Sequence, residues 1–173
     1  MASINVSTSA LPVPSPKQRA NKTVLMGLDE SRHSSAALQW VFDYLLVSGD
    51  KLVVVTVIDK ESERESTTSR VKTLLRAAYE AEGIAVSMGT RVVVSNNAGQ
   101  AIASQAEEVK PAFLVLSSAG KSHVEGLLVG SVSQYCIKNV QDCPVIIARM
   151  TKKDELTDSA GNVGSERKSP SWF

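Results

Sequence analysis

Apolar and polar positions alternate along this chain at two spacings, and the change of spacing divides it into short elements. Five short runs are mostly apolar and largely rich in β-branched side chains, as in parallel strands buried on both faces. We predict these runs as strands at residues 23–28, 51–58, 90–94, 112–116 and 145–148.

Between the runs, apolar residues recur every three or four positions, which is the spacing of a helix with one buried face. The first helix is predicted over residues 34–46 with Ser31 or Ser34 as its cap, and the fourth begins at Gly130 and Ser131. The residues expected on the buried face are Ala37, Leu38, Val41 and Leu45 in the first helix, and Val71, Leu74, Leu75 and Ala78 in the second, which ends at Gly83. They are Ala101, Ile102, Gln105, Ala106 and Val109 in the third, which ends before Pro111, and Val132, Tyr135, Cys136 and Val140 in the fourth. Strands that alternate with helices predict an α/β fold with a parallel sheet covered on both faces.

The two ends of the chain differ from its middle. Residues 1–22 are rich in Ser, Thr, Ala and Pro, residues 151–173 mix charge with Ser and Gly, and neither segment carries a periodic apolar stripe. We therefore predict a disordered N-terminal segment (1–22), one α/β domain (23–150) and a disordered C-terminal tail (151–173). Cytoplasmic localisation is the expectation, and an organellar one is the alternative if the acid-poor residues 1–22 are a transit peptide.

Charge and cysteine content exclude several classes of function. The formal net charge is +1 over 173 residues, so no basic surface for nucleic acid is expected, and no apolar stretch is long enough to span a bilayer. Cys136 and Cys143 are too few for a disulfide scaffold or a zinc site and are expected to be reduced packing residues. We expect neither nucleic acid nor a membrane as a partner.

The segment after the fourth predicted strand carries the clearest chemistry. It runs from Ser117 through Gly120 to Gly130-Ser131-Val132-Ser133, where free backbone N–H groups, hydroxyls and the positive end of a helix dipole would meet an anion. Gly120-Lys121-Ser122 is not a Walker A loop, because the required first glycine position holds Val115. The competing interpretation is a surface loop whose glycines serve turn geometry alone.

This spacing resembles the nucleotide-binding motif of the universal stress protein family, in which Gly, two residues, Gly, nine residues, Gly and Ser or Thr follow the fourth strand. Gly120, Gly130 and Ser131 match, and Ser117 stands where the family has its first glycine. Asp29, in Leu-Asp-x-Ser after the first strand, matches the family's acidic residue, and Val57 takes the place of the valine whose backbone pairs with adenine. Cys-Pro-Val-Ile-Ile-Ala at the end of the domain adds to the resemblance.

The resemblance implies a doubly wound domain with strand order 3-2-1-4-5, ATP as ligand, and Mg²⁺ or Mn²⁺ with the nucleotide. The implied nucleotide site comprises Asp29, Val57, Ser117, Gly120, Gly130, Ser131, Val132 and Ser133, with Lys121 and His123 as candidate phosphate contacts. Ser117 is expected to weaken binding, because its Cβ adds bulk where the family backbone approaches the ligand. Asp29 has two interpretations that stay open, a helix cap and a ligand contact.

Two function classes follow from these residues, and a true enzyme is a third option that the missing general base and nucleophile disfavour. The first is a regulatory module of stress-response type that binds an adenine nucleotide, with at most slow ATP hydrolysis because no general base and nucleophile can be placed together. The second is a nucleotide-free dimeric interaction protein that keeps only the fold. A homodimer is expected in either class, because the apolar last strand would form an edge of the sheet, and an unidentified protein partner is expected as well.

Overall fold

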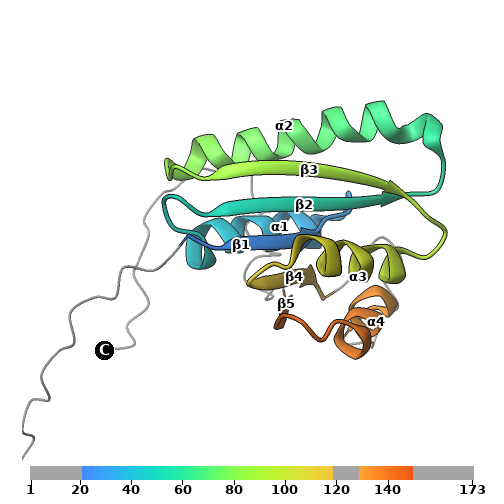
Figure 1. Ribbon diagram of the computed structural model, residues 1–173. Coiled ribbons are helices and arrows are strands. Elements are labelled where there is room, and N and C mark those ends of the chain that lie inside the picture. The colour runs from blue at the N-terminus through green and yellow to red at the C-terminus, as the bar shows by residue number, and fades with distance from the viewer. Residues whose placement is uncertain (1–20, 119–128, 150–173) are drawn as a thin grey trace, which may run out of the picture.

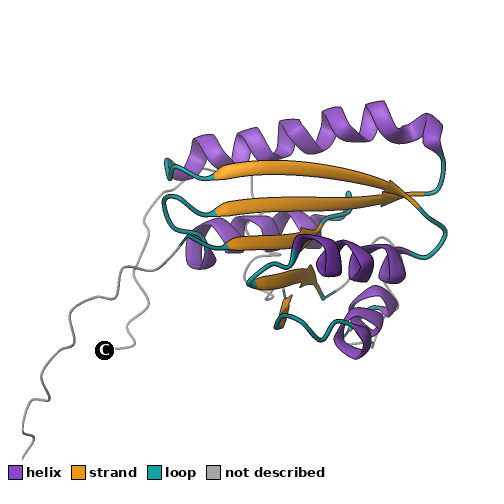
Figure 2. Cartoon of the chain, in the orientation of Figure 1, coloured by secondary structure: helices purple, strands orange, loops and turns teal. Residues whose placement is uncertain are grey.

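The computed structural model describes residues 21–118 and 129–149, and these residues form one five-stranded sheet with helices on both sides (Figures 1 and 2). The strands are β1 (Thr23–Gly27), β2 (Lys51–Ile58), β3 (Ser87–Val94), β4 (Phe113–Ser117) and β5 (Val145–Ala148). The helices are α1 (Arg32–Trp40), α2 (Arg64–Glu82), α3 (Ala98–Val109) and α4 (Ser131–Asn139), with a π-helical turn at Val41–Leu45 and a 3₁₀ turn at Glu61–Glu63. The predicted tails at 1–22 and 151–173 lie almost wholly outside the described residues.

The sheet is parallel throughout, in the order β3-β2-β1-β4-β5. The predicted α/β class and strand order are confirmed. The chain first builds outward from β1 to β2 and β3, and then returns to place β4 and β5 on the other side of β1. The order therefore reverses between β1 and β4, which is where open parallel sheets leave a crevice at the carboxyl ends of their strands.

Successive strand residues point to opposite faces, and this alternation divides the core into two layers. Val24 and Met26 of β1 pack on one face together with residues of α1 and α2, whereas Leu25 between them packs on the other face with residues of α3 and α4. Figure 1 shows α1 and α2 on one side of the strands and α3 and α4 on the other. Both faces of the sheet are thus buried, which explains the continuous apolar runs in the sequence.

Two elements differ clearly from their predicted form, whereas β1 and β4 differ from their predicted bounds by one residue. β3 begins at Ser87, three residues before the predicted start at Thr90, because its first residues pair with β2 through the backbone at the edge of the sheet, where no apolar side chain is required. The first helix changes at Val41 into a π-helical turn that ends when the Leu46 N–H donates to the Val41 carbonyl at 3.0 Å. Periodicity alone could not show this change, since Val41 and Leu45 keep their places near the core.

A buried carboxylate fixes the start of the domain. Asp50, which precedes β2 and is 1% exposed, accepts from the backbone N–H of Lys22 at 3.0 Å and from that of Val47 at 2.9 Å. The Lys22 ammonium group forms an ion pair with the same carboxylate. The Lys51 N–H donates to the Lys22 carbonyl at 2.9 Å, so the chain that leads into β1 is tied at several points to the turn before β2.

Candidate functional site

The corner that follows β1 is organised around one carboxylate oxygen. Asp29 Oδ1 accepts from the Ser31 N–H at 3.0 Å, the Ser31 hydroxyl at 2.5 Å and the Ser34 hydroxyl at 2.7 Å. The N-cap of α1 is Ser31, whose hydroxyl accepts from the Ser34 N–H at 3.2 Å. Asp29 therefore holds the capping serine and the first turn of α1 in place, and the corner places this carboxylate at the carboxyl end of β1.

The corner that follows β4 meets the first corner through serine side chains. Ser117, the last residue of β4, has its hydroxyl oxygen 3.3 Å from that of Ser34. The backbone carbonyl of Ser117 accepts from the Ser133 hydroxyl of α4 at 3.0 Å. Among the described non-glycine residues, only Lys110 has a positive φ, so Ser117 carries none of the left-handed strain that replacement of a glycine can cause.

The first turn of α4 is open to an anion. Gly130 is its N-cap, with φ −71° and ψ 165°, and provides no side-chain cap. Within the described residues, no hydrogen bond engages the N–H groups of Ser131, Val132 or Ser133, which is the usual state of a first helical turn. Three donors and the positive end of the helix dipole thus point out of the helix beside β4, an arrangement that suits a phosphate group.

One part of the predicted cradle is wrong. The N–H of Gly130 is not free, since it donates to the carbonyl of Ser118 at 3.0 Å. This bond fixes the entry of α4 against the end of β4, so the N–H of Gly130 is not among the open donors of the first turn. Gly120, Lys121 and His123, which were also predicted to contact the ligand, lie outside the described residues.

The predicted adenine contact, Val57, lies on β2 beyond the end of β1. The Leu28 N–H donates to the Val55 carbonyl at 2.9 Å, and the register of β1 with β2 ends at Gly27 and Val55. In a parallel strand, the N–H and C=O groups of every second residue point to the same neighbouring strand. Val57 is two residues after Val55, so its N–H and C=O groups also point to the β1 side. At that position β1 has already ended. A backbone donor and acceptor are thereby presented at the carboxyl edge of the sheet.

The sequence interpretation missed Ser34 as a site residue and treated it only as a candidate helix cap. Ser34 is 1% exposed and occupies the buried stripe of α1, three, four and seven residues before Ala37, Leu38 and Val41. A serine in an otherwise apolar stripe was the available signal, because a buried hydroxyl requires a hydrogen-bond partner. Its partners are Asp29 and Ser117.

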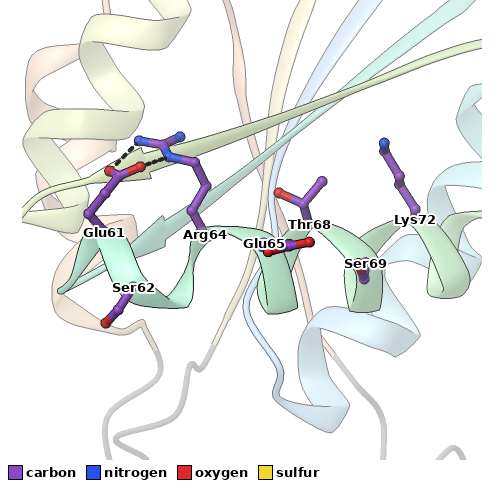
Figure 3. Close-up of a pocket in the computed structure, with 7 residues that line it drawn as sticks. All are labelled: Glu61, Ser62, Arg64, Glu65, Thr68, Ser69 and Lys72. Atoms are coloured by element: carbon purple, nitrogen blue, oxygen red, sulfur yellow. Dashed lines mark hydrogen bonds and ion pairs between the residues drawn. The ribbon is translucent and has the colours of Figure 1, made fainter.

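A separate hollow lies along the outer side of α2 (Figure 3). It has a volume of about 570 Å³ and is lined by Glu61, Ser62, Arg64, Glu65, Thr68, Ser69 and Lys72. Arg64 pairs with Glu61 there and also donates to the carbonyl of Val92 on β3 at 2.5 Å. The hollow shares no residue with the predicted site, and its charged and hydroxyl-bearing lining does not offer the apolar walls that a purine base prefers.

Other catalytic or metal chemistry finds little support in the part of the chain that the structure describes. Burial raises the pKa of the Cys136 thiol to about 11. Burial also raises the pKa of Cys143. A hydrogen bond from the Leu114 backbone lowers this pKa by less, and the charge of Asp142 raises it further. A raised pKa favours the neutral thiol at both positions, which is the less nucleophilic form. Residues 21–118 and 129–149 contain no group of three or more His, Cys, Asp or Glu side chains able to hold a metal ion.

Within residues 21–118 and 129–149, no helix is both long enough and apolar enough to cross a bilayer.

Comparison with known proteins places these features in one family. The model of the universal stress protein family matches residues 20–149. The chain is 30% identical over 147 residues to Universal stress protein A family protein C25B2.10 of Schizosaccharomyces pombe, a match that covers 78% of this chain and 47% of that protein. A match to Uncharacterized protein C167.05 of the same yeast, at 29% identity, covers 78% of this chain and 24% of that protein, so the chain spans about half the length of these relatives or less.

Solved structures agree with the fold. A universal stress protein crystallised in complex with cAMP is 26% identical, with a TM-score of 0.59 over 77% of this chain and 100% of that one. Hypothetical protein MJ0577 is 20% identical, with a TM-score of 0.63 over 75% of this chain and 96% of that one. The similarity to MJ0577 concerns the fold alone. The other structure has a similar fold and contains a bound adenine nucleotide.

Proposed function

The chain belongs to the universal stress protein family, and from this premise we propose that it is a regulatory module of stress-response type that binds ATP in the crevice between the corners after β1 and β4. The observation that carries the proposal is the open first turn of α4, with the N–H groups of Ser131, Val132 and Ser133 directed out of the helix at the reversal of strand order. A related universal stress protein binds cAMP, which supports an adenine nucleotide as the class of ligand for this chain.

The roles of the residues follow from the donors and acceptors that each presents. The first turn of α4 would bind phosphate, with Gly120, Lys121 and His123 as further motif positions in the proposal. The backbone of Val57 would pair with the edge of the base, and Asp29 would accept from the ribose or from the adenine amine. A divalent cation, Mg²⁺ or Mn²⁺, would be held mainly by the phosphates, because the described residues provide no cluster of metal-binding side chains.

Binding is tested on protein purified without added nucleotide. Heat denaturation followed by mass spectrometry should identify a copurified adenine nucleotide, and calorimetric titration with ATP and magnesium should give one site per chain. We expect a Kd below about 1 mM, equivalent to a binding free energy of about −4 kcal/mol or stronger. An empty preparation with no heat of binding and no thermal shift in millimolar ATP or AMP would reject the proposal.

A second candidate function is a nucleotide-free interaction protein, and two contacts favour it. The hydroxyl of Ser117 lies against Ser34, and the N–H of Gly130 is bonded within the protein. Both contacts reduce the number of groups available to a ligand relative to a cradle built from glycines. This candidate becomes the better one if the nucleotide titrations show no binding while the protein still forms a dimer.

We propose further that the protein forms a homodimer through β5. Among the residues that the structure describes, this strand pairs with β4 alone. Its residues Val145 and Ile147 are partly buried on one face, and Ile146 and Ala148 are partly buried on the other. An apolar strand with an unpaired edge favours association with a second copy. The cytoplasm is the proposed location, and an organelle remains the alternative given by residues 1–22.

Charged side chains on β5 should disrupt this dimer. A Val145→Asp/Ile147→Lys variant should be either monomeric by light scattering or insoluble, because it places charges on an apolar strand whose side chains are partly buried. Ile147→Pro should also give the monomer mass. It removes only an N–H that points to the outer edge of β5, because the carbonyls that accept from β4 are those of Pro144 and Ala148.

The matched control carries charges on the opposite edge strand, as Met88→Asp/Val94→Lys, where both side chains are between a third and two fifths exposed. The control should remain dimeric. If all three variants keep the wild-type mass, or if the control alone dissociates, the interface is not at β5.

A further inference from the structure

Three buried or half-buried serines connect the two corners of the crevice. Ser34 comes from the first turn of α1, Ser117 from the end of β4 and Ser133 from the first turn of α4. Ser34 and Ser133 are 1% and 3% exposed, so their hydroxyls cannot rely on bulk water for hydrogen bonds. The connection joins residues that are 83 and 16 positions apart in the sequence.

The direction of these hydrogen bonds can be assigned by counting protons. The single proton of the Ser34 hydroxyl is donated to Asp29 Oδ1 at 2.7 Å, while its oxygen accepts from the Asp29 N–H at 3.2 Å. Ser34 must therefore accept in its 3.3 Å contact with Ser117, and Ser117 must donate. On the other side of Ser117, its carbonyl accepts from the Ser133 hydroxyl at 3.0 Å. Hydrogen bonds thus run without interruption from α4 through Ser117 and Ser34 to Asp29.

We infer that Ser34 and Ser117 are positioning residues for the nucleotide, which form a serine bridge that sets the Asp29 corner at a fixed place relative to the first turn of α4. This inference rests on the proposed nucleotide-binding function. A glycine at position 117 would keep the carbonyl contact to Ser133 but would lack the hydroxyl that reaches Ser34. The serine at this position therefore adds a bond between the two corners, and its effect on affinity comes through Asp29 and α4.

The prediction is a loss of affinity that is not additive. Ser117→Ala keeps the Cβ and removes only the hydroxyl, and it should weaken binding of AMP and of ATP by about three- to tenfold, the usual range for one hydrogen bond. Ser34→Ala removes the bonds to Asp29 as well and should cost at least as much. The double variant should bind no more weakly than Ser34→Ala, because both changes break the same bridge.

Two further variants separate positioning from general loss of structure. Ser117→Thr restores a hydroxyl on a side chain that a strand accommodates well, and it should bind AMP within about twofold of the wild type. Ser35→Ala, one residue along α1, removes an exposed hydroxyl whose only described contact is at 3.5 Å, and it should leave affinity unchanged. Losses that add in the double variant, or a loss in Ser35→Ala as large as in Ser34→Ala, would overturn the inference.

Failure of the bridge can be distinguished from failure of nucleotide binding. The same four proteins of the cycle, wild type, both single variants and the double variant, are unfolded with urea in the absence of ligand. The bridge predicts that the effects on the unfolding constant couple by at least about threefold. Coupling in urea without any binding of AMP or ATP would reject the proposed function and keep the bridge, whereas binding without coupling would reject the bridge alone.

Discussion

Replacing Gly130 by aspartate is expected to abolish binding of ATP and AMP without loss of stability. Gly130 is the N-cap of α4 with φ −71°, and an added Cβ would lie 3.7 Å from its nearest neighbour, the Ser118 carbonyl, which is an ordinary contact. An aspartate at an N-cap accepts from the N–H groups of the first turn, here those of Val132 and Ser133. It would therefore occupy the donors proposed for phosphate and add a negative charge beside them.

The magnitude follows from both effects. We expect the Kd to rise at least 100-fold, which corresponds to about 2.8 kcal/mol, because the phosphate loses its donors and meets a carboxylate. The melting temperature should stay level or rise slightly, since aspartate is a better N-cap than glycine by a few tenths of a kcal/mol and also complements the helix dipole.

Two controls test the reasoning by calorimetric titration. Gly130→Asn competes for the same N–H groups without the charge and should weaken binding less than Gly130→Asp. Gly130→Ala adds only the Cβ and should bind within a few-fold of the wild type, because the space is available. Equal affinity in Gly130→Asp and the wild type would show that the first turn of α4 does not hold phosphate.

The sequence predicted the bounds of two strands without error, and those of β1 and β4 to within one residue. β2 and β5 have the predicted bounds, because Lys51–Ile58 and Val145–Ala148 are continuous runs of residues that favour a parallel sheet. β3 was predicted too short, since its first residues pair through the backbone at the edge. The pattern of apolar and polar side chains indicates which residues are buried. It cannot predict the start of a strand that is fixed by main-chain hydrogen bonds alone.

The sequence predicted where Asp29 and Ser131 lie in the fold, but not the hydrogen bonds around them. Strand order and the glycine spacing placed Asp29 and Ser131 at the reversal of the sheet, because the carboxyl ends of parallel strands share one edge. The contact of Ser34 with Ser117 spans 83 residues, and no local pattern encodes such a pair. The bond from Gly130 to Ser118 depends likewise on where α4 docks, which is a property of the packed molecule.

Removal of the Asp50 carboxylate should cause the largest loss of stability among single substitutions considered for this domain. In Asp50→Ala, the N–H groups of Lys22 and Val47 lose their acceptor, and the Lys22 ammonium group loses its counter-ion. The carboxylate that is removed is buried, since Asp50 is 1% exposed. Breaking a buried, hydrogen-bonded pair by removing one partner costs about 3 kcal/mol. Urea unfolding at pH 7 measures this difference directly, and Asp43→Ala, which removes an exposed acid nearby, is the matched control with an expected change below about 0.5 kcal/mol.

The same substitution has a predicted dependence on pH. Burial raises the pKa of Asp50, but the hydrogen bonds from the Lys22 side chain and from the backbone of Lys22 and Val47, together with the charge of Lys22, lower it by more, so the pKa lies below its ordinary value. A carboxyl group with a depressed pKa in the folded state stabilises the protein fully above its unfolded pKa of about 3.9 and loses this contribution as the pH falls through the folded value. The stability difference between the wild type and Asp50→Ala should therefore be constant from neutral pH down to about pH 5 and shrink below about pH 4. A difference that is small at pH 7, or that grows as the pH falls, would show that the ion pair does not hold the N-terminal entry of the chain to the sheet.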